Sequence, residues 1–187
     1  MKLIGLLGMA TGLCVAVPAT AEVVSATPTT IDIHDNVTVD APIQQVWDTL
    51  RAPQRWWSKD HTYSDDAANL YLDTQATGCF CERLPDHKGS VEHARILYIQ
   101  PPQMMRLTGA LGPLQAEAVV GTLTFRLEQE GSNATKLTLD YVVSGYVRAG
   151  ADTLAPKVDE VLALQVMNLK LAAESPPPGD PGDKSDK

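Results

Sequence analysis

The chain has 187 residues, a length that fits one ordinary domain and excludes two sizeable ones. Hydrophobic residues make up 44% of the sequence and charged residues 20%, values typical of a globular protein rather than a disordered or fibrous one. Because 23 Asp and Glu outnumber 15 Lys and Arg, the net charge is −8, so we expect no nucleic-acid partner, which a broad basic field would favour.

Residues 1–21 have the pattern of an export signal: Lys2 is followed by an apolar run over residues 3–17 and by the small residues of Ala19-Thr20-Ala21. The pattern predicts that the mature chain begins at Glu22 and that the protein is exported, to the periplasm or outside the cell. An uncleaved membrane anchor is the alternative, but the apolar run is shorter than the ~20 residues that a span needs. We therefore expect no integral membrane span after cleavage.

The composition divides the remaining chain into three parts. Residues 22–29 are small and polar and are predicted to be a short leader. Residues 174–187 are rich in Pro, Gly and charge and are predicted to be a disordered acidic tail. The folded domain is therefore expected over residues 30–173.

Alternating apolar residues predict a first strand over residues 31–39, with a break at His34-Asp35. A helix is predicted over residues 42–50, because apolar residues recur there at helical spacing: Ile43, Val46, Trp47 and Leu50. Residues 54–57 are expected to form a second short helical turn.

From Asn69 to Val143, apolar segments separated by turn residues predict an antiparallel meander of strands. The turns fix the register, and these residues are expected to lie opposite each other: Leu70 and Cys81, Leu72 and Cys79, Cys79 and Ala94, Cys81 and Glu92, Ile96 and Leu107, Tyr98 and Met105, Leu127 and Leu137, Phe125 and Leu139, and Leu123 and Tyr141. Residues 152–173 carry a helical apolar stripe, so a long helix is expected to lie across the apolar face of the sheet.

The order of these elements, together with particular stretches of sequence, resembles the START-like or SRPBCC superfamily. The stretches are VDAPIQQVWDTL at 39–50, RWW at 55–57, TGCFCERL at 77–84, QPP at 100–102, GALGPLQAEAVVGTLTF at 109–125, LDYVVSGY at 139–146 and LAPKVDEVLALQVMNLK at 154–170. The resemblance spans residues 36–173. It is closest to polyketide-cyclase-like members and to the C-terminal domain of the ATPase activator of a heat-shock chaperone.

The resemblance implies an α+β helix-grip fold, in which a curved antiparallel sheet of six to seven strands wraps a long C-terminal helix around a cavity, with two short helices after the first strand. Members bind lipids, sterols, polyketides or plant hormones, and a minority are enzymes. No metal or cofactor motif is general to the superfamily, so we expect neither here. The residues predicted to line the cavity are Trp57, Leu72, Cys79, Cys81, Ile96, Tyr98, Leu107, Phe125, Tyr141, Leu162 and Val166.

Cys79 and Cys81 are two residues apart on one predicted strand, so both side chains are expected on the same face. At a spacing of ~6.6–6.8 Å they lie at the far limit of disulfide geometry. A zinc site would need two more ligands, but His87 falls in a loop and His93 is expected to point outward opposite Phe80. We interpret the pair as small apolar side chains in the cavity wall, and reaction of an inward thiol with an electrophilic ligand stays open.

Glu92, Tyr98 and Tyr141 are the candidates for acid–base catalysis, because all three are expected on the inward face. Glu82 falls one position out of phase. No carboxylate or histidine is predicted beside a polarising donor, and the tyrosines are equally typical of a protein core. Of the adjacent tryptophans at 56–57, the second is expected at the cavity mouth. It is followed by a polar connection over residues 58–68, for which two interpretations stay open, a lid and a plain solvated loop.

The sequence thus favours an exported protein that binds a small hydrophobic or amphipathic molecule, lipid- or polyketide-like, in an internal cavity. One alternative is a polyketide cyclase-like enzyme. Another is a protein-interaction module related to chaperone ATPase activators. The sequence leaves open the ligand, the openness of the cavity, any reaction and the oligomeric state.

Overall fold

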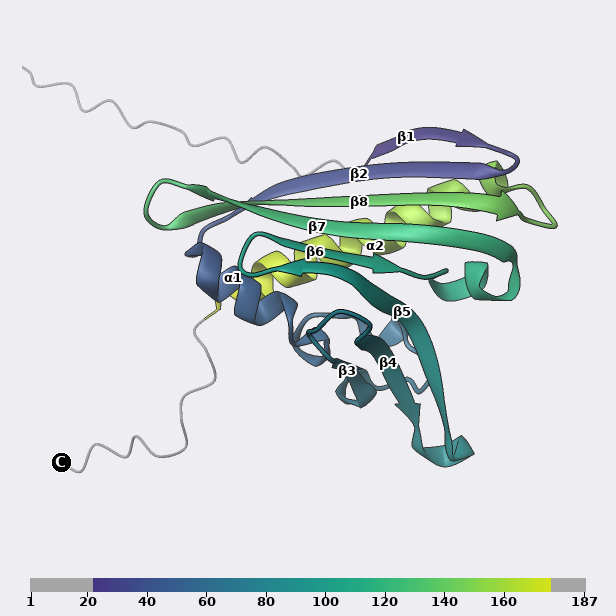
Figure 1. The fold of residues 1–187 in the computed structure, drawn as a ribbon, viewed down its shortest axis with the longest axis horizontal. Helices are drawn as coiled ribbons and strands as arrows, with labels where there is room; N and C mark the ends of the chain where they lie inside the picture. Colours follow the sequence, from purple (N-terminus) through teal and green to yellow (C-terminus); the bar gives the residue numbers. More distant parts are fainter. Residues whose placement is uncertain (1–21, 176–187) are drawn as a thin grey trace, which may run out of the picture.

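The computed structural model describes residues 22–175 (Figure 1). The predicted signal peptide, residues 1–21, lies outside this range, as do residues 176–187 of the predicted tail. Among the helices described, none has the length and apolar character needed to cross a membrane.

Eight strands form one open antiparallel sheet in the spatial order β1-β2-β8-β7-β6-β5-β4-β3. The strands are β1 Glu22–Thr27, β2 Thr30–Val39, β3 Leu70–Leu72, β4 Cys79–Leu84, β5 Gly89–Gln100, β6 Met104–Thr108, β7 Ala118–Glu130 and β8 Ala134–Tyr146. The prediction of six to seven strands is wrong because β1, which pairs with β2, is formed by residues that were predicted to be a leader.

The helices lie where the apolar spacing predicts them. Two α-helices, α1 Ile43–Leu50 and α2 Ala151–Glu174, are accompanied by short 3-10 helices: η1 Pro53–Arg55, η2 Lys59–His61, η3 Ala67–Asn69, η4 Pro85–His87 and η5 Gly112–Ala116. The short turn predicted at 54–57 corresponds to η1.

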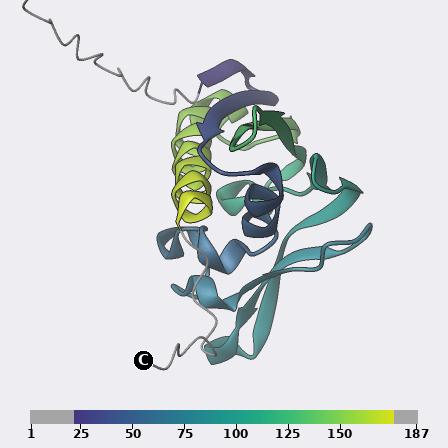
Figure 2. The same ribbon diagram turned by 90° about the vertical axis from the view of Figure 1, so that its left-hand side faces the viewer.

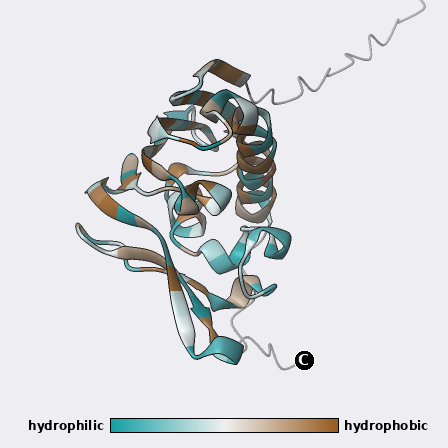
Figure 3. Cartoon of the chain, turned by 90° about the vertical axis from the view of Figure 1, so that its right-hand side faces the viewer, coloured by the Kyte–Doolittle hydropathy of each residue, from teal (hydrophilic) through white to brown (hydrophobic). Residues whose placement is uncertain are grey.

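The long helix α2 lies along one face of the sheet, against β1 and β2 and next to α1 (Figure 2). Its buried side recurs every three or four residues: Ala151, Ala155, Val158, Leu162, Val166, Leu169 and Ala173. Figure 3 shows the hydrophobic residues of α2 gathered toward the sheet, whereas the far tip of the β4–β5 arm is hydrophilic. Burial of this apolar interface is the main source of the fold's stability.

The predicted register is confirmed over the central hairpin. In β7 and β8, Leu127 lies opposite Leu137, Phe125 opposite Leu139 and Leu123 opposite Tyr141. Ile96 also lies opposite Leu107, as predicted. These side chains fill the space between the sheet and α2 and are almost completely buried.

Two β-bulges, both on β5, change the predicted register. The first lies at His93, because Phe80 pairs with Ala94 and Cys81 with Glu92, so that Cys79 pairs with Arg95 rather than Ala94. In the β3–β4 pairing, which has no bulge, Leu70 pairs with Glu82 rather than Cys81. Because a bulge adds one residue to one strand, the side chains beyond it exchange faces. On β5 the extra residue His93 and its neighbour Ala94 are both buried, which strict alternation forbids.

The second bulge lies between Ile96 and Tyr98 of β5. Tyr98 pairs with Arg106, and Ile99 takes its predicted place opposite Met105. The prediction that Tyr98 points inward is therefore wrong, and its side chain is 46% exposed. Despite these shifts, Cys81 pairs with Glu92 as predicted.

Candidate functional site

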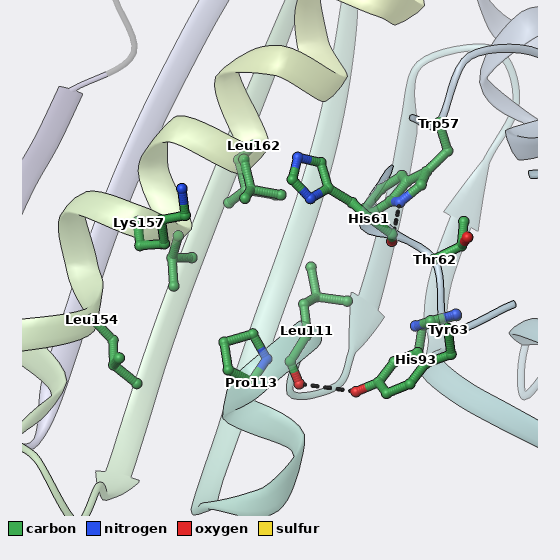
Figure 4. Close-up of a pocket in the computed structure, with 13 residues that line it drawn as sticks. Trp57, His61, Thr62, Tyr63, His93, Leu111, Pro113, Leu154, Lys157 and Leu162 are labelled. Atoms are coloured by element: carbon green, nitrogen blue, oxygen red, sulfur yellow. Dashed lines mark hydrogen bonds between the residues drawn. The ribbon is translucent and has the colours of Figure 1, made fainter. Parts of the chain in front are cut away.

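A pocket of about 390 Å³ opens between the N-terminal half of α2 and the segment that joins η1 to β3 (Figure 4). Its volume lies within the range of roughly 300–1,000 Å³ that is usual for small-molecule sites. The walls are mostly apolar. The lining residues are Trp57, His61, Thr62, Tyr63, His93, Leu111, Gly112, Pro113, Leu154, Lys157, Val158, Val161 and Leu162.

The segment 57–64 forms one wall of the pocket and is tied to α2. The indole Nε1 of Trp57 donates a hydrogen bond to the backbone oxygen of His61 at 3.0 Å (Figure 4). The backbone N–H of Ser58 donates to Oε1 of the buried Gln165 on α2 at 2.8 Å. The first bond orders the segment internally, and the second ties the segment to the helix.

Tyr63 joins the same segment to the opposite wall. Its hydroxyl donates to the backbone oxygen of Gly112 at 3.2 Å and lies 3.3 Å from Oε1 of Gln115, both in η5 (Figure 4). Gly112 has a φ of +54°, a conformation that favours glycine. The pocket is thus bounded by three connected elements rather than by a free loop.

Glu82 and His93 form a buried pair behind this wall. The Nε2 atom of His93 lies 3.0 Å from Oε2 of Glu82, and the two residues are 5% and 0% exposed. Glu82 also accepts hydrogen bonds from the backbone N–H groups of Tyr63 at 3.1 Å and Ser64 at 2.6 Å. One carboxylate therefore connects β4, β5 and the pocket wall.

The two groups differ in charge. Burial raises the pKa of Glu82, but the hydrogen bonds from Ser64, Tyr63 and His93 outweigh it, and the net pKa lies below its usual value. Burial lowers the pKa of His93, and Glu82 opposes this only in part. At neutral pH the pair is a carboxylate that accepts a hydrogen bond from a neutral imidazole.

The neutral tautomer leaves Nδ1 of His93 as an acceptor. No hydrogen bond from residues 22–175 reaches this atom, and His93 is part of the pocket lining. Its ring packs between Tyr63, at a centroid distance of 5.8 Å, and Phe80, at 5.1 Å. An oriented, neutral histidine at a pocket wall can accept a proton or a hydrogen bond from a bound molecule.

Of the residues predicted to line a cavity, Trp57 and Leu162 line this pocket. Leu72, Leu107 and Phe125 surround a separate void of only about 20 Å³ beneath the tryptophans, a space for one water molecule at most. Ile96 and Val166 are each 1% exposed and belong to the packed core. The space between the centre of the sheet and α2 is therefore filled by side chains, and the cavity lies at one end.

The three catalytic candidates do not meet in the pocket. Tyr98 is exposed and donates to Oε1 of Gln100 at 2.8 Å. Glu92 is exposed and forms an ion pair with Arg95. Tyr141 is fully buried, and burial raises its pKa to about 12, so its hydroxyl is a structural donor rather than a base.

Cys79 and Cys81 form a disulfide, which corrects their interpretation as two free thiols. Their Cα atoms lie 5.4 Å apart, closer than the ~6.6–6.8 Å spacing of a regular strand. An oxygen of Glu92 and both sulfur atoms lie within 4.8 Å of one another. In the disulfide state the sulfur atoms are not available as thiolate ligands for a metal.

Sequence reasoning missed the polar members of the site. His93 was expected outside the sheet because the bulge in β5 was not foreseen, and Glu82 was expected out of phase because β3 and β4 pair one residue away from the predicted register. His61 lies on the short helix η2 and Lys157 on α2, and the sequence pattern of neither segment carries a signal for a pocket. The pairing of Leu70 with Glu82 places Glu82 on the inner face, and the bulge at His93 brings that side chain there as well.

No protein-family model matches this sequence, and no curated protein matches it significantly. Solved structures do match. CalU16 from Micromonospora echinospora aligns with a TM-score of 0.56 and 16% identity over 84% of this chain and 87% of that one. A conserved protein of unknown function from Enterococcus faecalis gives 0.58 and 15% over 84% and 77%, and protein MLL2253 from Mesorhizobium loti gives 0.54 and 14% over 75% and 95%. These likenesses show the fold, an antiparallel sheet with a long C-terminal helix, consistent with a helix-grip fold.

Proposed function

We propose that this protein binds a small apolar or amphipathic molecule, lipid- or polyketide-like, in the pocket between segment 57–64 and α2. The observation that supports the proposal is the pocket itself: about 390 Å³, with mostly apolar walls and a few polar groups. A molecule that fills it would bury most of its apolar surface against Trp57, Leu111 and Leu162.

The polar groups favour a ligand with one polar end. His93 lines the pocket and its Nδ1 is an acceptor, whereas the Tyr63 hydroxyl is already bonded to η5. Lys157 lines the same pocket and pairs with Glu160 at 2.9 Å. A hydroxyl or protonated carboxyl group near His93 would satisfy the acceptor, and the remainder of the ligand would contact the apolar walls.

The sequence pattern at residues 1–21 supports export as part of this proposal. The family resemblance supports membership of the START-like superfamily, and the likeness to solved structures supports the same helix-grip architecture. An exported protein with such a pocket would carry or store its ligand outside the cytoplasm.

Native mass spectrometry of the protein, purified without organic extraction, tests the binding function. We expect either a small molecule released on denaturation in a 1:1 ratio, or 1:1 uptake from a mixture of fatty acids, lysolipids and aromatic polyketides. A protein that carries nothing and takes up nothing from this mixture would refute the proposal and favour the protein-interaction alternative.

A second function, a polyketide cyclase-like enzyme, is favoured by the Glu82–His93 pair. A neutral histidine oriented by a buried carboxylate can remove a proton from a bound substrate, with Nδ1 as the base. The test is turnover of a bound polyketide by the native protein and by the variant His93→Gln. Turnover that survives this substitution would exclude His93 as the base.

A further inference from the structure

The disulfide between Cys79 and Cys81 lies in β4, outside the lining of the pocket described above. Cys79 is half-buried, whereas Cys81 is 6% exposed. On the neighbouring strand β5, Cys79 pairs with Arg95 and Cys81 pairs with Glu92. Arg95 and Glu92 also form an ion pair with each other, so charges of both signs lie beside the disulfide.

This disulfide is poorly placed to act as a structural cross-link. It encloses a single residue, Phe80, and the stabilisation from a disulfide grows with the length of the loop that it closes. In addition, β4 is held on one side by β3 and on the other by β5 through backbone pairing. The strand therefore keeps its position when the disulfide is opened, and the sulfur atoms can change oxidation state within the folded protein.

We propose that Cys79 and Cys81 are a redox-active pair, which exchanges with external thiols in the folded protein and reacts through the sulfur of Cys79. Attack at Cys79 follows from exposure, because the sulfur of Cys81 belongs to a buried residue. The charges of Glu92 and Arg95 on β5 then influence the rate of the exchange, because the attacking sulfur is a thiolate and the leaving sulfur becomes one.

The reaction balances with a dithiol as reductant. A thiolate of the reductant bonds to Sγ of Cys79, the disulfide breaks, and Sγ of Cys81 leaves as a thiolate that takes a proton from water. The second thiol of the reductant then attacks the sulfur that the reductant contributes to the mixed disulfide. This attack releases Cys79. Two electrons and two protons pass from the dithiol to the protein, and the reductant becomes a cyclic disulfide.

The opposite charges of Glu92 and Arg95 should have opposite effects on the rate at which the disulfide is reduced. A carboxylate within 4.8 Å of both sulfur atoms repels the attacking anion, and the guanidinium opposes this effect. Glu92→Gln should accelerate reduction about fourfold at low ionic strength, the effect of one unit charge at that distance in water. Arg95→Gln should slow it. Each substitution breaks the same ion pair, so a purely structural role would move both rates in one direction.

The experiment uses the full chain, purified without reductant. The folded protein is incubated with dithiothreitol and then alkylated with iodoacetamide. Mass spectrometry then gives the mass of the tryptic peptide of residues 60–83, which contains both cysteines. We expect two alkyl groups on this peptide after reduction, and none before it or after reoxidation with oxidised glutathione. With monomeric glutathione, Cys81→Ser should form a mixed disulfide at Cys79, whereas Cys79→Ser should form one much more slowly.

Two results would overturn the proposal. Alkylation of both cysteines before any reduction would show that they are ordinary thiols. A disulfide that resists dithiothreitol until urea unfolds the chain would show that it is inert in the folded protein. Circular dichroism, recorded throughout, separates reduction of the folded protein from reduction that follows unfolding.

Discussion

Gly121 on β7 lies directly beside the ring of Tyr141 on β8, so close that a Cβ atom at residue 121 would lie 2.7 Å from the phenol oxygen. That oxygen donates to the backbone oxygen of Gly109 and accepts from the backbone N–H of Leu111, each at 3.0 Å. Leu111 is part of the pocket wall. The missing side chain at residue 121 therefore allows a buried tyrosine to fix one side of the pocket.

Gly121→Ala should displace both Tyr141 and the backbone oxygen of Gly109, which would lie 2.4 Å from the added Cβ. It should destabilise the protein by about 2 kcal/mol or more, as overpacking of a core does. Tyr141→Phe should cost about 1–2 kcal/mol, because the N–H of Leu111 loses its partner. Urea unfolding measures both changes. Gly89→Ala is the matched control, since its added Cβ would meet nothing closer than 3.9 Å, and an equal loss in this variant would contradict the explanation.

Asp35 should make the protein less stable as the pH rises. It occupies an inward position of β2, is 1% exposed, and burial followed by the charge of Asp159 raises its pKa to about 6. Because the unfolded pKa is about 3.9, the folded state binds the proton more tightly. The contribution of Asp35 to stability is therefore greatest below about pH 4. This contribution falls by about 3 kcal/mol by pH 7.

Asp35→Asn should remove this dependence, because the amide does not ionise. Urea midpoints measured from pH 4 to pH 8 should show a flatter profile for the variant and greater stability than the wild type at pH 7 and above. Asp32→Asn, on the same strand but less buried, is the control and should follow the wild-type profile. A parallel fall of Asp35→Asn and the wild type would contradict the assignment.

Glu82→Gln should loosen the pocket wall and destabilise the protein by about 2–3 kcal/mol at pH 7, because three hydrogen bonds lose their charged acceptor. The pKa of Glu82 is lowered, so its contribution is present above the unfolded pKa and disappears as the pH falls through the folded pKa. The difference between variant and wild type should therefore shrink on acidification. Thermal unfolding at several pH values measures it, and Glu128→Gln, at an exposed site on β7, should change little.

His93 should stay neutral at pH values where an ordinary histidine is protonated, since burial lowers its pKa below 6.5. Nuclear magnetic resonance of the imidazole nitrogens should show one neutral tautomer, protonated at Nε2, between pH 8 and pH 6.5. A midpoint for His93 at or above 6.5 would contradict the described pair.

Val161→Trp should weaken ligand binding at least tenfold, because the larger side chain occupies the pocket. Leu164→Trp is the control, because it also enlarges a side chain of α2 but at a position that is 41% exposed and outside the pocket lining. This variant should bind the ligand like the wild type. Titration with the molecule identified by mass spectrometry measures both affinities. Equal affinities in the two variants would move the binding site elsewhere.

The fold was largely predictable because its main elements have regular patterns. Uninterrupted alternation on both sides of a short turn places Leu127 opposite Leu137 and fixes the whole β7–β8 register. The helical spacing of apolar residues predicts α1 and α2 in the same way. Strand β1 was missed because Pro28 and small residues made its segment look like a leader.

The candidate site was much less predictable, because it depends on a bulge. Nothing in the residue types marks His93 as an extra residue in β5, yet this bulge brings its side chain inward beside Glu82. The second bulge turns Tyr98 outward in the same way. The location of the pocket depends in addition on hydrogen bonds between distant segments, such as Ser58 with Gln165, which no local pattern encodes.

The hydrogen bond between Ser58 and Gln165 also has a consequence for the order of folding, because its two partners are 107 residues apart in the chain. The segment that forms the pocket wall is made early by the ribosome, but its partner on α2 is made only after all eight strands. Until α2 emerges, the apolar face of the sheet has no cover and the nascent chain is prone to aggregate. The pocket is therefore completed last, and a chain cut before residue 151 would be a client for chaperones rather than a weaker binding protein.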